Sequence, residues 1–186
     1  REINVGTYVV DGEFLFSALE KLDPSNAQGE YYLTDIIRLA VEQGRRVAAV
    51  VLDNPDEGLG VNTRRQLAEA EQVVRQQIRD RWLDAGVTMI DPASTWIDAA
   101  VTIGKDTVLY PNVTLEGTTV IGEDCVLHSN TRLTDCIVGN GVEILDHCLF
   151  AASHIEDDAR LGPFVHLRPG VVVRKKAKVG NFVEMK

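Results

Sequence analysis

Large apolar residues recur every six positions from Ile97 to the end of the chain. A helix repeats its apolar face every 3.6 residues and a half-buried strand every two, so neither element gives a long period of six. Short strands joined by tight corners do give it, and three of them close one turn of a parallel β-helix. The period therefore predicts an all-β solenoid of hexapeptide repeats with about five turns. The series is Ile97, Ile103, Leu109, Leu115, Ile121, Leu127 and Leu133, then Val138, Ile144 and Phe150, then Ile155, Leu161, Leu167, Val173, Val179 and Met185.

The period is interrupted twice, between Leu133 and Val138 and between Phe150 and Ile155, where the step is five residues. We interpret both interruptions as corners shortened by one residue. Solenoids of this kind are known for left-handed coiling, although the period alone does not reveal the hand.

The chain has three cysteines, an odd number that argues against a disulfide framework and favours a reducing, cytoplasmic location. Cys125 and Cys148 occupy the smaller inward positions of the repeat, and we expect them to fill the core. Cys136 falls at the first interruption and receives no assignment.

Charge and hydropathy exclude several classes of function. The net charge of −9 argues against general binding to nucleic acid or to an anionic membrane. No apolar run approaches the roughly 20 residues of a membrane span, and no signal peptide is visible. The basic stretch from Arg174 to Lys178 is a local exception, which could attract phosphate or another anionic ligand, or could equally be a solvated face.

The first ninety residues show the pattern of an α/β layer followed by a long connecting helix. We expect strands at 7–10, 46–52 and 87–90, and helices at 13–22, from Thr34 or Asp35 to Gln43, and from Asn62 or Thr63 to Ala85. The buried stripe of the long helix is predicted to be Leu67, Val74, Ile78 and Trp82. Two or three strands make a poor parallel sheet, so further strands are expected before residue 1, and both chain ends suggest a fragment.

Six short segments resemble one family. They are residues 2–6 (EINVG), 26–35 (NAQGEYYLTD), 60–62 (GVN), 162–164 (GPF), 167–170 (LRPG) and 179–186 (VGNFVEMK). In this order they resemble the bacterial bifunctional enzymes that make UDP-N-acetylglucosamine for the peptidoglycan of the cell wall. Those enzymes combine glucosamine-1-phosphate acetyltransferase and N-acetylglucosamine-1-phosphate uridyltransferase activities.

The resemblance implies a domain organisation and a set of partners. Residues 1–62 would be the C-terminal part of a Rossmann-like uridyltransferase domain, 63–86 the connecting helix, and 87–186 a truncated acetyltransferase domain formed by a left-handed β-helix. The parent enzyme would form a homotrimer and use acetyl-CoA, glucosamine-1-phosphate and UTP to make UDP-N-acetylglucosamine.

Two asparagines resemble ligand-binding residues of the uridyltransferase half. Asn4 resembles the asparagine that binds UDP-N-acetylglucosamine, although it also fits a turn. Asn62 resembles the residue that contacts the nucleotide sugar and ligates Mg²⁺, although it also fits a helix N-cap. The aspartate that shares the metal and the glycine-rich nucleotide loop would lie before residue 1. We therefore expect no Mg²⁺ in this fragment and no uridylyl transfer from it.

Arg168 and Lys186 resemble the basic residues that hold the sugar phosphate accepting the acetyl group. Arginine offers a planar fork to phosphate oxygens and lysine a point charge. The two residues are 18 positions apart, about one turn of the solenoid, so they should project from the same side of adjacent coils.

The family's catalytic base is a histidine expected beyond Lys186, so we assign no catalytic residue here and expect the isolated fragment to be inactive. The four histidines, His128, His147, His154 and His166, fall at different places in the repeat, which argues against a zinc site. Two alternatives remain: another sugar nucleotidyltransferase with a regulatory β-helix, and a non-catalytic trimerisation scaffold.

Overall fold

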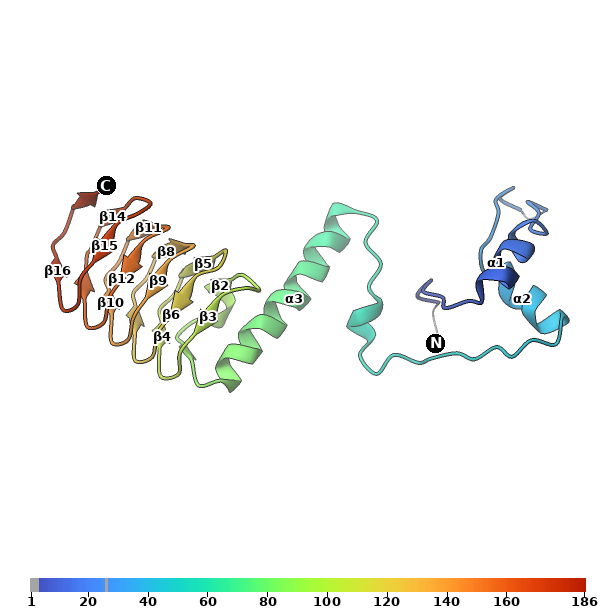
Figure 1. Cartoon of the computed structure of the whole chain (residues 1–186), viewed down its shortest axis with the longest axis horizontal. Coiled ribbons are helices and arrows are strands. Elements are labelled where there is room, and N and C mark those ends of the chain that lie inside the picture. The colour runs from blue at the N-terminus through green and yellow to red at the C-terminus, as the bar shows by residue number, and fades with distance from the viewer. Residues whose placement is uncertain (1–3, 26) are drawn as a thin grey trace. The chain divides into compact units, whose positions relative to one another are not determined.

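A computed structural model describes residues 4–25 and 27–186 (Figure 1). Glu2, Ile3 and Asn26 of the family-like segments lie outside the described residues. The chain divides into two compact units, one up to Ala70 and one from Glu71 to Lys186. We describe each unit by itself.

The first unit holds two short helices around a small apolar cluster. Helix α1 spans Gly12–Leu19, α2 spans Asp35–Glu42, and a 3-10 turn, η1, spans Pro55–Gly58. Asp11 caps α1 by accepting a hydrogen bond from the Phe14 N–H at 2.9 Å. The predicted helices are thus confirmed, with shorter bounds. Their shared core is Phe14, Ala18, Ile36 and Ala40.

The strands predicted at 7–10 and 46–52 are not formed, so both predictions are wrong. Both segments have the valine-rich composition of strands, but a strand also needs a neighbour that accepts and donates its backbone hydrogen bonds. Neither segment finds one in the described chain, and the side chains of Val9, Val50 and Val51 are 102%, 90% and 83% exposed.

Helix α3 spans Arg64–Asp84 and crosses the boundary between the units. Of the two predicted caps, Thr63 is correct: its Oγ1 accepts from the Gln66 N–H at 3.2 Å. Gln66 Oε1 accepts from the Thr63 N–H in return, at 3.0 Å, which completes a capping box. The helix ends before Gly86, whose φ of 89° suits a residue without a Cβ.

The predicted buried stripe of α3 is only half right. Ile78 and Trp82 pack against the apolar core of the second unit. Leu67 and Val74, however, are 57% and 52% exposed, so they do not belong to a buried stripe.

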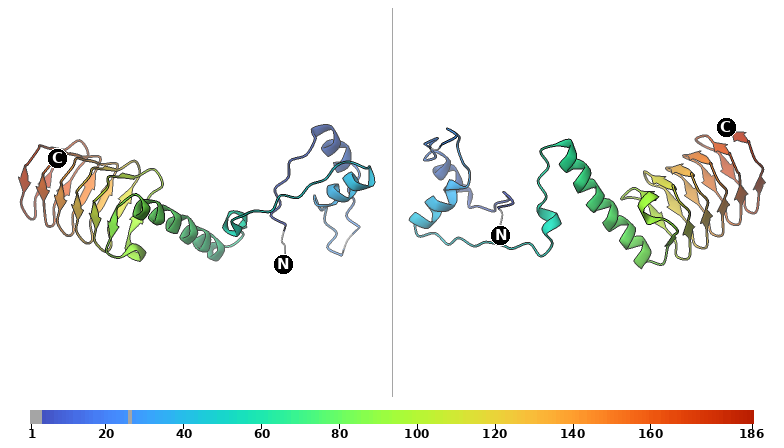
Figure 2. Two further views of the ribbon diagram at one scale, coloured as in Figure 1. Left: turned by 90° about the horizontal axis from the view of Figure 1, so that it is seen from below. Right: turned by 180° about the vertical axis from the view of Figure 1, so that it is seen from behind.

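The second unit is a parallel β-solenoid with three sheets, one on each side (Figures 1 and 2). The first sheet contains β1 (Thr88–Met89), β4 (Val108–Leu109), β7 (Val126–Leu127), β10 (Glu143–Ile144), β13 (Arg160–Leu161) and β16 (Lys178–Val179). The second contains β2 (Trp96–Ile97), β5 (Thr114–Glu116), β8 (Arg132–Thr134), β11 (Leu149–Ala151), β14 (His166–Leu167) and β17 (Glu184–Met185). The third contains β3 (Thr102–Ile103), β6 (Val120–Ile121), β9 (Ile137–Val138), β12 (His154–Ile155) and β15 (Val172–Val173). A short 3-10 turn, η2 (Pro92–Ser94), precedes β2.

The register explains the two interruptions. Leu115 pairs with Leu133, 18 positions later, whereas Ile121 pairs with Val138 and Leu133 with Phe150, each 17 positions later. Both short steps lie at the corner from the second sheet to the third, after β8 and after β11. The predicted one-residue shortening of a corner is confirmed, since the pairing continues through both.

The predicted inward series forms the core. Each of its members from Ile97 to Val173 is at most 6% exposed. Val179 and Met185, in the last two described strands of the series, are half-buried and pack against this core. Buried threonines keep their hydroxyls paired: Thr107 Oγ1 donates to Gly122 O at 2.9 Å and accepts from the Cys125 N–H at 3.1 Å.

All three cysteines are free and buried, which confirms the core role of Cys125 and Cys148. Cys136, unassigned from sequence, occupies the same kind of position: its N–H donates to Thr119 Oγ1 and its carbonyl accepts from the Val120 N–H. Burial raises the pKa of each thiol, so none resembles an activated nucleophile.

All three corners of the solenoid contain residues with positive φ, and the corner between the first and second sheets also carries an aromatic stack. At this corner His147, Phe164 and Phe182 stack with ring centroids 4.9 Å apart, and their planes are nearly parallel. Asparagine, which tolerates the left-handed region, occupies the same corner in the two preceding coils, where Asn112 Nδ2 donates to Asn130 Oδ1 at 3.2 Å.

Candidate functional site

The solenoid brings Arg168 and Lys186 to the same place in adjacent coils. Leu167 pairs with Met185, and the Arg168 N–H donates to the Met185 carbonyl at 3.1 Å. Each basic residue therefore follows directly after its strand, β14 or β17, and both are exposed. The arrangement is the one that the 18-residue spacing predicts.

A carboxylate holds the Arg168 side chain. Glu184 Oε1 lies 2.5 Å from both Nε and Nη2 of Arg168, and 3.6 Å from Nδ1 of His166. Sequence reasoning missed Glu184. The signal was available, because a strand places residues i and i+2 on one face, so Glu184 shares a face with Lys186.

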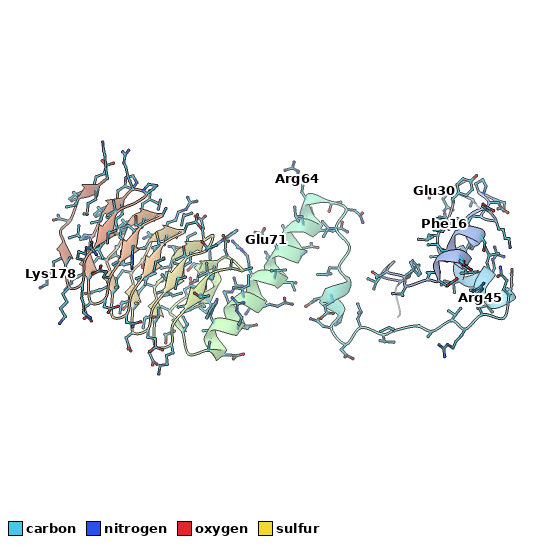
Figure 3. All side chains as sticks on the ribbon, viewed as in Figure 1. Phe16, Glu30, Arg45, Arg64, Glu71 and Lys178 are labelled. Carbon is cyan, nitrogen blue, oxygen red and sulfur yellow. The ribbon has the colours of Figure 1, made fainter. Side chains whose placement is uncertain are left out.

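The basic stretch after β15 is partly neutralised by the coil before it. Arg174 Nη1 lies 2.8 Å from Glu156 Oε1, and Lys175 Nζ lies 3.1 Å from Asp157 Oδ2. The hydrogen bond from Arg174 lowers the pKa of Glu156. Lys178, in β16, is exposed (Figure 3). Two of the four charges thus belong to ion pairs across coils.

The four histidines lie in four different columns of the solenoid. His128 stacks on Tyr110 and lies 3.5 Å from Glu143, and His147 belongs to the aromatic corner. His154 lies in β12 on the third sheet and His166 in β14 on the second. Within residues 4–25 and 27–186, no three His, Cys, Asp or Glu side chains are grouped so that they could hold a metal ion.

In the first unit, Asn4 makes two local contacts. Its Oδ1 accepts from the Gly6 N–H at 3.0 Å, and its Nδ2 donates to Tyr8 Oη at 2.6 Å. The amide thus closes an Asx turn, as the turn interpretation predicts.

Asn62 is exposed, and its backbone N–H donates to Gln66 Oε1 at 2.9 Å. Because Thr63 caps α3, the Asn62 amide is not needed for the helix. Val5, the neighbour of Asn4, lies close to Gly58, four residues before Asn62: its Cγ2 is 3.1 Å from where a Cβ of Gly58 would stand.

Among the described residues, none of the helices combines the length and the apolar character needed to cross a membrane.

One family model matches part of the solenoid. The bacterial transferase hexapeptide family (six repeats) matches residues 100–135. A solved GDP-perosamine N-acetyl transferase from Caulobacter crescentus covers 60% of this chain and 60% of its own at 15% identity, with a TM-score of 0.26, too low to support a comparison of sites.

Proteins named bifunctional protein GlmU match the chain from end to end. The protein from Heliobacterium modesticaldum is 46% identical over 186 residues, and that from Pelotomaculum thermopropionicum is 48% identical over 186 residues. In both cases the match covers 100% of this chain and 40% of the relative. The chain is thus similar over its whole length to bifunctional GlmU proteins and spans about two fifths of the length of such a protein.

Proposed function

We propose that the solenoid carries part of an acetyltransferase site, in which Arg168 and Lys186 bind the phosphate of glucosamine-1-phosphate. The observation that supports this proposal is their register. Adjacent strands lie about 4.8 Å apart, so the two cations can contact oxygens of one phosphate group. In the whole protein, acetyl-CoA would supply the acetyl group to the amine of the bound sugar.

Glu184 gives this site a defined geometry. It occupies Nε and Nη2 of Arg168 and so fixes the plane of the guanidinium, which leaves Nη1 for a phosphate oxygen. A preorganised fork loses less conformational entropy on binding than a free one.

The site is tested by titrating glucosamine-1-phosphate into the full chain in a calorimeter. We expect Arg168→Gln to weaken binding by roughly 10- to 100-fold, the equivalent of about 1.5–3 kcal/mol for a charged hydrogen bond. Arg132→Gln is the matched control, because Arg132 lies on the same sheet and pairs with Glu116 of the neighbouring coil at 2.8 Å. Equal affinity of wild type and Arg168→Gln would refute the site.

We further propose that this chain alone does not transfer acetyl or uridylyl groups. Acetyl transfer needs a base for the acceptor amine, and none of the four histidines shares the column of Arg168 and Lys186. Turnover of acetyl-CoA with glucosamine-1-phosphate, or of UTP with N-acetylglucosamine-1-phosphate, by the purified chain would contradict the proposal.

For the first unit we propose that residues 1–62 belong to a uridyltransferase domain, with Asn4 and Asn62 at its sugar-nucleotide site. Asn62 has an amide oxygen to offer to Mg²⁺, but one oxygen does not make a six-coordinate site. The described part of the chain therefore does not fit a complete magnesium site. We expect UDP-N-acetylglucosamine, if it binds, to bind equally with Mg²⁺ and with EDTA.

We also propose that the solenoid assembles as a homotrimer. The third sheet supports this, because its outer face carries three exposed apolar side chains in one column, Val120, Ile137 and Val172, which are 41%, 52% and 43% exposed. Light scattering coupled to size-exclusion chromatography should give three times the chain mass, and Ile137→Glu should lower it.

A further inference from the structure

The second half of α3 presents two arginines on the face that packs against the solenoid. Arg75 and Arg79 are one helical turn apart and half-buried, on the same face as Ile78 and Trp82. The guanidinium of Arg75 lies over the ring of Trp96 in β2. Two cations thus occupy positions where a helix usually places apolar side chains. Figure 3 labels Glu71 on α3, the residue at which the second unit begins.

Donors on this face lack acceptors from the protein. Among the described residues, four buried side-chain nitrogens have no hydrogen-bond partner: Arg75 Nε, Arg75 Nη2, Arg79 Nε and Trp82 Nε1. All four belong to this stretch of α3, and all are donors. Buried donors are nearly always paired in native structures, so a group that supplies acceptors is expected here.

The local acceptors do not meet this demand. Glu71 Oε1 lies 3.7 Å from Arg75 Nε, too far for a hydrogen bond, and its side chain is 51% exposed. Gln76 Oε1 accepts from Arg79 Nη2 at 2.7 Å but leaves Nε unpaired.

Electrostatics favour a negative charge at the same place. Burial lowers the pKa of Arg75, the charge of Arg79 lowers it further, and Glu71 opposes both effects. Guanidinium groups nevertheless stay charged in proteins, so the two cations repel each other at neutral pH. An anion between them would relieve the repulsion and accept from the free N–H groups.

We propose that Arg75, Arg79 and the adjoining tryptophan Trp96 form a binding site for a small oxyanion of the phosphate class. Phosphate offers only acceptors, and its geometry matches the arginine fork. The site is separate from the acetyl-acceptor site, because Arg168 and Lys186 lie in the last coils whereas Trp96 lies in β2. The phosphate group could be inorganic or could belong to a phosphorylated metabolite.

Tryptophan emission provides a specific readout, because both tryptophans of the chain lie close to the proposed site: Trp82 on the same face of α3, and Trp96 in β2 under Arg75. Sodium phosphate is titrated into the full chain at constant ionic strength, with sodium chloride as the comparison. We expect a saturable change of emission with half-saturation in the millimolar range. A parallel titration with glucosamine-1-phosphate distinguishes the sources, since an organic phosphate that fits the site would saturate at lower concentration.

Three variants test the assignment. Arg75→Gln and Arg79→Gln should each raise the half-saturating concentration by about tenfold or more, while Arg75→Lys, which keeps the charge but loses the fork, should fall between them and the wild type. Arg65→Gln is the matched control, an exposed arginine of the same helix, and should change nothing. Far-UV circular dichroism checks that each variant is folded. If Arg75→Gln does not fold, Arg75→Lys still tests the assignment.

The outcome is independent of the proposed function, because Arg168→Gln should keep the full emission response to phosphate even where it abolishes binding of glucosamine-1-phosphate at the other site. The proposal is overturned if phosphate gives no saturable change beyond that of chloride, or if Arg75→Gln and Arg75→Lys respond like the wild type. It is also overturned if emission changes with protein concentration and not with phosphate, since a carboxylate from a second copy would then be the acceptor.

Discussion

Substituting Gly122 by alanine should separate the effect of coil spacing from that of backbone conformation. A Cβ at Gly122 would lie 2.4 Å from Asn140 Oδ1 and 2.6 Å from the carbonyl carbon and oxygen of Gly139, in the next coil. Carbon contacts are comfortable at about 3.5–4.0 Å, so the coils would have to separate by about 1 Å at this corner.

That separation would strain the hydrogen bonds that hold the coils together. The Gly122 N–H donates to the Val138 carbonyl at 2.8 Å, and the Glu123 N–H donates to Asn140 Oδ1 at 2.8 Å. Overpacking against a rigid backbone costs about 1–3 kcal/mol. We expect Gly122→Ala to lower the free energy of unfolding by that amount.

Gly180→Ala is the matched control. Gly180 also follows a large inward residue, but a Cβ there meets nothing within 4 Å. Its substitution should change the free energy of unfolding by less than about 0.5 kcal/mol. Urea unfolding of both variants, followed by far-UV circular dichroism, measures the difference. If the two variants are equally stable, close packing of coils is not what requires glycine at position 122.

Three further changes test the core, a coil-to-coil ion pair and the thiols. Leu127→Ala should cost about 2–5 kcal/mol in the same unfolding assay, because Leu127 is fully buried between Leu109 and Ile144. The hydrogen bond from Arg132 lowers the pKa of Glu116. Ionised Glu116 therefore stabilises the folded state at pH values above the usual pKa of a carboxyl group. This contribution is lost as the pH falls through the lowered pKa of Glu116. The difference in free energy of unfolding between wild type and Glu116→Gln should accordingly shrink as the pH falls from about 5 to about 3. A constant difference would show that ionised Glu116 does not stabilise the fold. The three cysteines should be inert to Ellman's reagent in the native protein and react fully in guanidinium chloride, whereas rapid native labelling would show that the core opens.

The solenoid could be predicted closely from sequence because each coil imposes the same local rule. Except at two corners, a residue six positions after an inward residue points inward again. The exceptions are the shortened corners after Leu133 and Phe150, where the next inward residue comes five positions later. Stacking with neighbouring coils then buries the whole series.

The first unit could be predicted only in part, because strands depend on partners. Residues 46–52 have the composition of a buried strand, yet hydrophobic pattern alone cannot provide a neighbouring strand. Helices α1 and α2 satisfy their own backbone hydrogen bonds, so their existence was predictable. Leu67 and Val74 show the same limit on a helix, since an apolar stripe is buried only where something packs on it.

The candidate sites differ in the same way. Arg168 and Lys186 could be related by spacing, because 18 residues make one coil. The contact of Glu184 with Arg168 depends on which neighbours a side chain meets across coils. The half-buried position of Arg75 could not be predicted from the hydrophobic pattern, because an arginine in an amphipathic helix is ordinarily assigned to the solvent face.

The two short corners also determine how this fold can change in length. Coils of 17 and 18 residues coexist in one set of continuous sheets, and the missing residue is always taken from the corner between the second and third sheets. A residue lost inside a strand would instead turn an inward side chain outward, and every later partner would be misaligned. Insertions and deletions are thus tolerated at corners, which are the natural positions for grafting a loop onto the solenoid while its core stays unchanged.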